Sequence, residues 1–320
     1  MIESGPAPGI WKRKDLLDTD SLSRDEIDLV MHTADAMTEV RARPVSKLAT
    51  LRGAVVITLF YEQSTRTRAS FEVAGKSLGA DVVNISASGS SVEKGESLVD
   101  TIRTLEAIGA DALVIRHRSS GAPYLAARHT SACVINGGDG THAHPTQALL
   151  DLYTMRSRLG DMAGRKVAIV GDVLHSRVAR SNVWTLVAAG AFVTLCGPST
   201  LLPRSLSLLA EHGRVVTTPY LSEALDGADV VMALRIQKER QEAGLIPSLR
   251  DYINSYQITS ERLQAARPDV LLMHPGPVNE GIELAPEVAH GVRSLIEAQV
   301  ANGVAVRMAL LYVMLTARNR

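Results

Sequence analysis

Short runs rich in β-branched residues alternate along this chain with segments of helical periodicity, and this alternation restricts the fold more than any other feature. Strands separated by helices pair in parallel, because each helix returns the chain to the edge of the sheet from which the next strand starts. Strands are predicted at residues 54–60, 82–85, 112–115, 133–135, 166–170, 192–196, 230–234 and 270–273. The sequence therefore predicts an α/β protein with parallel sheets flanked by helices.

The length of 320 residues favours one large or two medium domains. Pro145 begins a helix at about 145–158, which we expect to bridge two domains. Another long helix, with apolar side chains along one face, is predicted at 295–315, and periodicity leaves open which domain it packs on. Residues 1–11 contain two prolines and two glycines and predict a flexible tail.

Composition excludes several kinds of partner. Lys plus Arg equals Asp plus Glu at 34 each, so no global field attracts the chain to nucleic acid or to an anionic membrane. No apolar run approaches the roughly 20 residues that a membrane span needs, and residues 1–9 lack a signal-peptide pattern. Cys133 and Cys196 lie in strand-like runs and are expected to be buried thiols in a reducing cytoplasm. No metal motif occurs, so no metal is predicted.

Polar residues and one glycine follow the predicted strands at the points where these strands end. The carboxyl ends of parallel strands share one edge of a sheet, and ligands of open α/β sheets bind at that edge. The residues at these positions are Ser64, Arg116, Asn136, Gly171, Arg235 and His274. We therefore treat them as candidates for one binding region.

The segment Ser64-Thr65-Arg66-Thr67-Arg68 lies between a strand and a helix. Hydroxyl groups at a helix start are explained by capping alone, since they accept bonds from free N–H groups. Capping does not explain the two arginines in the first turn, because the helix dipole disfavours cations there. A bound phosphate reverses that penalty, because N–H, hydroxyl and guanidinium groups all converge on it. The segment thus predicts an anion site, although the phosphate-binding GxxxxGK[ST] pattern is absent.

Further motifs are less specific when each stands alone. His142 and His144 are spaced like metal ligands but lack a third ligand. His144 and Gln147 could form a hydrogen-bonding pair at a helix start, and a purely structural role for His144 is an equally good interpretation of this motif. Gly171 after a strand is typical of dinucleotide-binding folds, but GxGxxG is missing, so a nicotinamide oxidoreductase is a weak alternative. Arg177 enters the next helix at its positive end, which again favours a nearby anion. The turn at 274–277 places two prolines around a glycine and is a plausible site for a cis bond.

Taken together and in this order, these segments resemble the transcarbamylase family, and within it the branch that uses aspartate. The likeness runs from about residue 12 to about residue 316. The segments that carry it are 64–68 (STRTR), 90–97 (SSVEKGES), 144–154 (HPTQALLDLYT), 171–181 (GDVLHSRVARS), 235–240 (RIQKER) and 274–277 (HPGP). The resemblance implies two α/β domains bridged by helices: a donor domain at 12–148, joined by the C-terminal helix at about 295–316, and an acceptor domain at 149–294.

The family catalyses attack by an amino-acid α-amine on carbamoyl phosphate, without a cofactor, and the resemblance implies a role for each matching residue. Catalysis would rest on Arg66, Thr67, Arg116 and His144. Carbamoyl phosphate would contact Ser64, Thr65, Arg66, Thr67, Ser90, Lys94, Arg116, His144, Gln147, Gly276 and Pro277. Aspartate would contact Lys94, Arg177, Arg235 and Gln237. Either Ser90 or Ser91 fills the serine position of the loop at 90–97, and ungapped spacing favours Ser90.

Residue chemistry agrees with aspartate as the acceptor. The three side-chain donors Arg177, Arg235 and Gln237, two of which are planar cations, suit an acceptor with two carboxylates. Ornithine-specific relatives typically carry a cysteine where this chain has Pro275, and no cysteine follows residue 196 here. The implied reaction belongs to pyrimidine biosynthesis in the cytoplasm. A transcarbamylase for another amino acid and a catalytically silent scaffold are the remaining alternatives.

Assembly is also implied by the resemblance. Lys94 and its neighbouring serine would reach the site of an adjacent subunit, so at least a homotrimer with shared active sites is expected. A regulatory chain or a dihydroorotase is a possible further partner. The sequence itself leaves both of these partners open.

Overall fold

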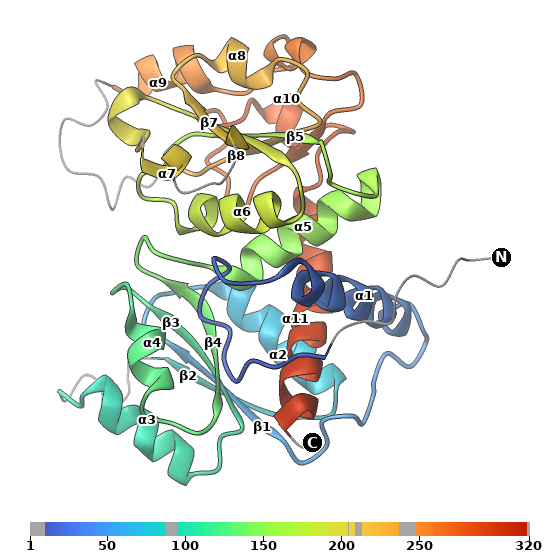
Figure 1. Ribbon diagram of the computed structural model, residues 1–320, viewed down its shortest axis with the longest axis vertical. Coiled ribbons are helices and arrows are strands. Elements are labelled where there is room, and N and C mark those ends of the chain that lie inside the picture. Colours follow the sequence, from blue (N-terminus) through green and yellow to red (C-terminus); the bar gives the residue numbers. More distant parts are fainter. Residues whose placement is uncertain (1–9, 87–94, 204, 209–212, 237–247, 319–320) are drawn as a thin grey trace. The chain divides into compact units, whose positions relative to one another are not determined.

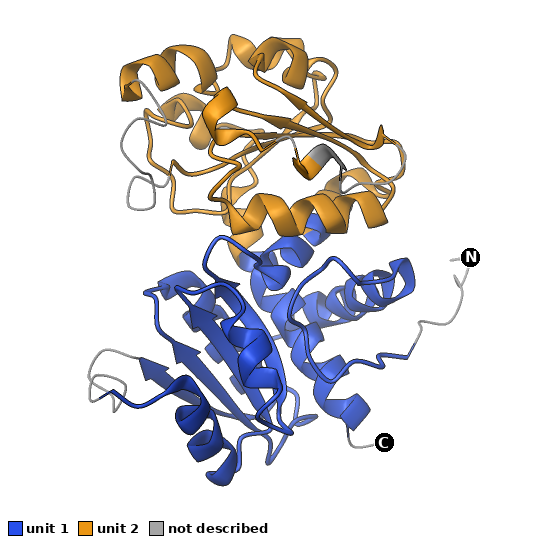
Figure 2. Cartoon of the chain, turned by 60° about the vertical axis from the view of Figure 1, so that its left-hand side comes forward, with its two compact units in different colours: residues 1–153, 301–320 blue, residues 154–300 orange. Residues whose placement is uncertain are grey.

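The computed structural model describes residues 10–86, 95–203, 205–208, 213–236 and 248–318. Its contacts divide the chain into unit 1, residues 1–153 with 301–320, and unit 2, residues 154–300 (Figure 2). Each unit contains one parallel sheet flanked by helices, which confirms the predicted α/β class. The division falls after Tyr153, inside a helix. The boundary expected from the sequence is after residue 148.

The sheet of unit 1 has four strands in the order β2-β1-β3-β4, and the neighbouring strands all pair in parallel (Figure 1). From β1 the chain adds β2 on one side and then crosses to add β3 and β4 on the other. The order therefore reverses between β1 and β3. The strands are β1 Val55–Phe60, β2 Asp81–Ser86, β3 Ala112–His117 and β4 Cys133–Asp139.

Helices cover both faces of this sheet. Ile57, Leu59 and Leu113 point to one face, where they form a buried cluster with Ile102 of α3 and Ala126 of α4. On the other face α2 packs so closely that a Cβ at its Gly75 would lie 2.6 Å from a methyl group of Val82. The helices of unit 1 are α1 Arg24–Arg41, α2 Thr65–Ser77, α3 Leu98–Ala107, α4 Ala122–Ala127, the first part of α5 Pro145–Leu159 and most of α11 Ile296–Arg318.

Helix α11 has 23 residues and is long and apolar enough, by length and composition alone, to cross a membrane. This property is not evident from the sequence as an uninterrupted apolar run, because the charged side chains Glu297 and Arg307 interrupt it. A buried core helix passes the same test, and 61% of the apolar window of α11 is buried. Arg307 itself is 3% exposed, lies 5.2 Å from the centre of the Phe71 ring and donates to the Ser70 hydroxyl at 3.0 Å. The helix is thus packed against α2 within unit 1.

The sheet of unit 2 has five parallel strands in the order β7-β6-β5-β8-β9, so its order reverses between β5 and β8. Its strands are β5 Lys166–Val170, β6 Phe192–Cys196, β7 Val215–Thr218, β8 Val230–Ala233 and β9 Leu271–Met273. The α-helices are α6 Arg177–Ala188, α7 Ser205–Leu208, α8 Leu221–Leu225, α9 Leu249–Tyr256 and α10 Pro286–Ala289, with short 3₁₀ turns at Ser199–Leu201 and Arg262–Ala265. Residues of α8 and α10 form a buried cluster with Val170 and Val231.

Several boundaries differ from the predicted ones. Strands β3 and β4 run on to His117 and Asp139, so Arg116 and Asn136 lie inside strands instead of after them. Trp11, at the end of the predicted tail, is 3% exposed, and its indole N–H donates to the carbonyl of Arg13 at 2.8 Å. The indole ring is a large apolar group, and its burial ties the chain to unit 1 from this residue onward. Cys133 and Cys196 are buried free thiols, as predicted.

Candidate functional site

In unit 1, the candidate residues gather where the strand order reverses. The chain leaves β1 at Phe60 and enters α2 at Thr65, while the neighbouring strand β3 ends at His117. Phe60 is the register partner of Arg116, and the N–H of Tyr61 donates to the carbonyl of Arg116 at 2.8 Å. Ligands of open parallel sheets bind at such a reversal, beyond the carboxyl ends of the strands. The sequence of β1 and β3 thus brings the start of α2 next to Arg116.

The first turn of α2 has the geometry of an anion site. Ser64 caps the helix, and its hydroxyl accepts from the N–H of Thr67 at 3.3 Å. Thr67 is 5% exposed, whereas the side chains of Thr65, Arg66 and Arg68 face solvent. No acidic residue occurs in this first turn. The positive end of the helix dipole and the exposed guanidinium groups therefore favour a bound anion.

Arg116 is the most enclosed cation on this edge, with 15% of its side chain exposed. Its Nη1 donates to the carbonyl of Gly137 at 3.3 Å, and its Nε lies 3.5 Å from Glu62 Oε2. A carboxylate and a carbonyl thus hold the guanidinium group at two points. An orientation fixed in this way leaves the planar fork ready to bind a further oxygen ligand.

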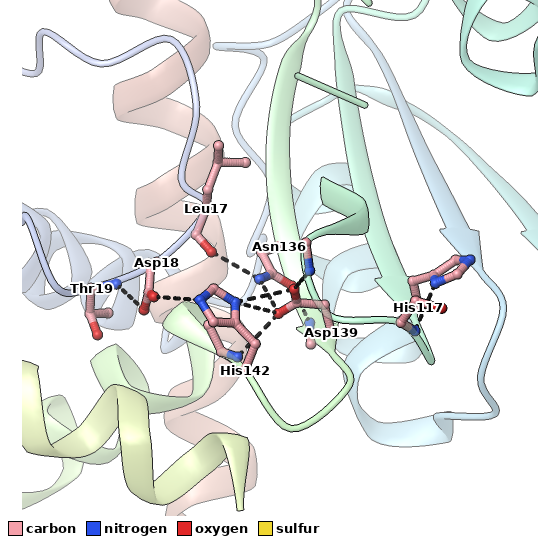
Figure 3. Close-up of polar contacts among 11 residues, drawn as sticks. Leu17, Asp18, Thr19, His117, Asn136, Asp139 and His142 are labelled. Atoms are coloured by element: carbon pink, nitrogen blue, oxygen red, sulfur yellow. Dashed lines mark hydrogen bonds and ion pairs between the residues drawn. The ribbon is translucent and has the colours of Figure 1, made fainter. Parts of the chain in front are cut away.

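The start of α5 adds His144 and Gln147. His144 is 4% exposed, and its carbonyl accepts from the N–H of Gln147 at 3.0 Å, which begins the helix at Pro145. The side-chain amide of Gln147 donates to buried Asp151 at 2.9 Å. Just before His144 the chain makes a turn at residues 139–143, in which Asp139 contacts His142 and Asn136 (Figure 3). Helix α5 follows β4, so these residues belong to the same sheet edge as Arg116.

In unit 2 the equivalent reversal lies between β5 and β8. Gly171 follows β5 with φ +134, and a Cβ at this position would lie 2.9 Å from the carbonyl of Leu234. Only glycine fits such a close approach in this backbone conformation. The turn leads to Ser176, whose hydroxyl caps α6 by accepting from the N–H of Ala179 at 3.0 Å. Arg177, the first residue of α6, is 5% exposed.

Arg235 follows β8 on the other side of this reversal and is half-buried. The next residue, Ile236, donates its N–H to Oε1 of Glu283 at 2.8 Å. Glu283 is 1% exposed and also accepts from the backbone and side chain of Asn279, at 2.9 and 2.7 Å. Burial raises the pKa of this carboxyl group, an effect that the hydrogen bonds from Ile236 and Asn279 oppose. Glu283 thus joins the loop after β8 to the loop after β9.

The loop after β9 contains the HPGP motif. His274 is 1% exposed, and its backbone N–H donates to Gln299 Oε1 at 3.0 Å. Its Nδ1 accepts from the N–H of Gly276 at 2.8 Å, so the ring proton of the neutral form lies on Nε2. The bond between Gly276 and Pro277 is cis, which agrees with the expectation for this turn. The backbone of the loop is therefore fixed by the buried imidazole.

The structure places the predicted residues in two groups. Unit 1 brings Ser64, Thr65, Arg66, Thr67, Arg116, His144 and Gln147 to the edge of its sheet, and unit 2 brings Arg177, Arg235, Gly276 and Pro277 to the edge of its own. Ser90, Lys94 and Gln237 lie outside the described residues. Within the described ranges, no group of three or more His, Cys, Asp or Glu side chains is arranged to hold a metal ion.

Two buried carboxylates that support these edges, Asp139 and Glu283, are not predicted from the sequence. Asp139 lies before His144 and Glu283 lies between the two loops of unit 2. The only sequence signal for Asp139 is an acidic residue close to a glycine turn at the end of an apolar run. Glu283 stands 47 residues from Ile236, so no local pattern indicates their contact.

Two parallel sheets, each with basic residues at its point of reversal, define a two-domain α/β protein built to bind anionic ligands. Residues 14–157 match the family described as aspartate/ornithine carbamoyltransferase, carbamoyl-P binding domain. Residues 163–314 match the aspartate/ornithine carbamoyltransferase, Asp/Orn binding domain. The chain belongs to the aspartate/ornithine carbamoyltransferase family, as the resemblance of its motifs indicates.

Relatives in sequence carry the aspartate name. The chain is 58% identical over 301 residues to the aspartate carbamoyltransferase catalytic subunit of Roseiflexus castenholzii, covering 94% of this chain and 95% of the relative. Identity to the corresponding subunit of Moorella thermoacetica is 54% over 308 residues, covering 96% of this chain and 99% of the relative. The match therefore extends over nearly the whole length of both relatives.

Solved structures show the same fold. Aspartate transcarbamoylase from Trypanosoma cruzi, in complex with carbamoyl phosphate and aspartate, has a TM-score of 0.85 at 32% identity and covers 93% of this chain and 96% of that chain. Ornithine carbamoyltransferase from Thermus thermophilus also has a TM-score of 0.85, at 28% identity, and covers 95% of this chain and 100% of that chain. Because the two scores are equal, the fold does not distinguish the acceptors.

Proposed function

We propose that this chain is the catalytic chain of an aspartate carbamoyltransferase, which converts carbamoyl phosphate and L-aspartate into N-carbamoyl-L-aspartate and phosphate in pyrimidine biosynthesis. The observation that carries the proposal is the placement of arginines at the reversal point of both sheets, within the aspartate/ornithine carbamoyltransferase family. Both substrates are anionic, and each edge offers positive charge to one of them. Identities of 54% and 58% to aspartate-named subunits support aspartate over ornithine.

In this proposal unit 1 binds the donor. Ser64, Thr65, Arg66 and Thr67 surround the phosphate at the start of α2. Arg116 contacts both the phosphate and the carbonyl oxygen, while His144 and Gln147 contact the carbamoyl group. Ser90 and Lys94 come from an adjacent subunit. Support comes from the capped, carboxylate-free first turn of α2 and from the enclosed Arg116 next to it.

Unit 2 binds the acceptor. Arg177, Arg235 and Gln237, with Lys94, hold the two carboxylates of aspartate, and the backbone at Gly276 and Pro277 orients the amine and the carbamoyl NH₂. A guanidinium fork binds a carboxylate through two parallel hydrogen bonds, which suits this division of roles. Support comes from the location of Arg177 and Arg235 on the two sides of the reversal between β5 and β8.

The reaction needs no covalent enzyme intermediate and no cofactor. The α-amine of aspartate attacks the carbamoyl carbon, the bond from that carbon to the phosphate oxygen breaks, and the phosphate accepts the proton that the amine loses. Thr67, Arg116 and His144 donate to the oxyanion that forms on the carbonyl oxygen. Holding the two substrates in contact contributes much of the rate, because effective molarities reach about 10⁵–10⁸ M for well-oriented groups.

Assembly and location follow from the same proposal. A site completed by Ser90 and Lys94 of a neighbour requires an oligomer. We expect at least a homotrimer, located in the cytoplasm. A regulatory chain or a dihydroorotase is a possible further partner of that trimer. The molar mass from light scattering tests the trimer directly, since a monomer of 34.3 kDa would contradict it.

The deciding experiment measures phosphate release from carbamoyl phosphate with either aspartate or ornithine. We expect phosphate release when carbamoyl phosphate is offered with aspartate, and none when it is offered with ornithine. Arg66→Ala should remove donor binding, whereas Arg235→Ala should raise the KM for aspartate roughly 10- to 150-fold, since a bond to a charged group contributes about 1.5–3 kcal/mol. Arg24→Ala, which removes an exposed arginine of α1 that pairs with Asp28, is the control. Turnover with ornithine, or with neither amine, would contradict the proposal.

A further inference from the structure

The imidazole ring of His142 lies between two carboxylates (Figure 3). Its Nδ1 is 3.2 Å from both carboxylate oxygens of Asp139, and its Nε2 is 3.2 Å from Oδ2 of Asp18. Asp139 is fully buried and the Asp18 side chain is 10% exposed. A neutral imidazole has only one N–H, so donation to both carboxylates requires the imidazolium form. His142 is therefore a cation held between two anions.

Asp139 organises the turn that precedes His144. Its Oδ1 accepts from the N–H of Ala143 at 3.1 Å and from the side chain of Asn136 at 2.8 Å, and its Oδ2 accepts from the N–H of Gly121 at 2.7 Å. The N–H of Asp139 donates in turn to the carbonyl of Ala143 at 3.1 Å. Ala143 is the residue directly before His144. The carboxylate thus fixes the backbone immediately before His144.

Asp18 belongs to a segment far away in the sequence that lies along the outer edge of β4. The N–H of Leu16 donates to the carbonyl of Val134 at 2.9 Å, and the N–H of Asn136 donates to the carbonyl of Leu16 at 2.9 Å. The side chain of Asn136 also donates to the carbonyl of Leu17 at 2.9 Å (Figure 3). His142 therefore connects this segment at the sheet edge to the turn at 139–143.

We propose that His142 is a positioning residue for carbamoyl transfer: as a cation between Asp18 and Asp139, it holds the turn that delivers His144 to the donor. The inference rests on the proposed function, because it assigns His144 to the carbamoyl group. Removing the cation leaves Asp139 buried opposite Asp18 without a compensating charge. A buried charge that loses its partner is strongly destabilising, so the turn should rearrange.

The electrostatics define the pH range of this effect. Hydrogen bonds that the ring donates to Asp139 and to Asp18 raise the pKa of His142 from 6.5 to about 10, although burial opposes them. The ring centres of Tyr124 and His142 lie 5.8 Å apart in a T-shaped arrangement. Asp20 acts electrostatically on Tyr124, and Asp139 acts on His117, which Arg118 and Glu62 also influence. Because the folded pKa lies above the ordinary value, the stabilisation is complete below about pH 6.5 and is lost as pH rises through about 10.

Three variants of the full-length chain test the proposal: His142→Gln, Asp18→Asn and, as the control, His290→Gln, which removes an exposed histidine paired with Glu280. We expect His142→Gln to lower kcat roughly 10- to 100-fold, since small displacements of catalytic groups have effects of this size, and to leave the KM for aspartate nearly unchanged. The alkaline decline of kcat should disappear in His142→Gln and move to lower pH in Asp18→Asn. The control should match the parent protein.

Nitrogen chemical shifts of the His142 ring provide a readout that does not depend on turnover. Both nitrogens should remain protonated at pH 8 in the parent protein, and the midpoint should fall in Asp18→Asn, which keeps every hydrogen bond to Asp139 and therefore the fold of the turn. A neutral ring at pH 8, or parent-like kcat and pH profile in His142→Gln, would overturn the inference. Absence of aspartate carbamoylation by the parent protein would instead contradict the proposed function.

Discussion

At the reversal point of unit 1, Ser64 and Thr67 belong to the first turn of a 13-residue helix, and Arg116 lies within a strand. In unit 2, Arg235 follows β8 at the reversal point and Gly276 lies in the loop after the neighbouring strand β9. The backbones of these two loops bond to the buried side chains of Glu283 and His274. Regular elements satisfy their own backbone groups, whereas loops depend on such side chains. The start of α2 and strand β3 should therefore keep their structure when Ser64 or Arg116 is substituted, whereas the loops after β8 and β9 should be sensitive to residues that touch no ligand.

The largest effect is expected from Arg116→Ala in unit 1. Removing one donor to a developing oxyanion costs roughly 10²–10³ in rate, and we expect a loss of kcat of this size. The strand pairing around Arg116 uses backbone groups, so the thermal unfolding midpoint should change little. Steady-state assays and calorimetry measure the two effects separately.

Arg116→Lys sharpens this test, because lysine keeps the charge but loses the planar fork. We expect it to recover only part of the lost rate. Arg103→Ala removes an exposed arginine of α3 and is the control. A large fall in the unfolding midpoint of Arg116→Ala would show that the donor edge relies on this side chain for its frame, contrary to the comparison.

In unit 2 the next largest effect is expected from Glu283→Gln. The amide keeps one acceptor oxygen but turns an NH₂ group toward the donors of Ile236 and Asn279. An unsatisfied buried donor costs about 1–3 kcal/mol, so the free energy of unfolding should fall by about that amount. The KM for aspartate should rise more than the KM for carbamoyl phosphate, because Arg235 precedes Ile236 directly whereas most proposed contacts of carbamoyl phosphate lie in unit 1.

Glu280→Gln is the matched control, since Glu280 lies in the same loop but is half exposed and pairs with His290 at the surface. Exposed ion pairs contribute about 0–1 kcal/mol, so this variant should behave like the parent protein. Equal changes in the KM values of both substrates for Glu283→Gln would break the distinction between the two edges.

Most of the helices and strands that are predicted correctly are predicted from local sequence patterns. Phe71, Ala74 and Leu78 are fully buried on the predicted stripe of α2, and Gly79 ends the helix with φ +82, as predicted. The edge strand β7 is not predicted although its four residues are all β-branched, because a run of four residues with no regular alternation is too short to indicate a strand. Helix α1 is not predicted either, although Ser23 and Glu26 form a capping box that marks its start.

The candidate site divides in the same way. Arg116 and Arg235 are predicted because a rule about strand ends applies to residues near each strand in the sequence. The supporting roles of Asp139 and Glu283 are not predicted, because they depend on contacts such as that between Asp139 and Gly121, or between Glu283 and Ile236. Such contacts arise only once the chain has folded, and no local spacing encodes them.

The smallest effect is expected from Ser64→Ala, which tests whether the cap of α2 contributes to binding as well as to folding. Loss of a capping hydroxyl costs about 1 kcal/mol of stability. Ser23→Ala, at the start of α1 in the same unit, removes an equivalent cap that accepts from the N–H of Glu26 at 3.2 Å. Both variants should therefore lose similar stability in denaturant unfolding. Only Ser64→Ala should also raise the KM for carbamoyl phosphate, because only the N–H groups of α2 lie beside Arg116; equal KM values in the two variants would reduce Ser64 to a structural cap.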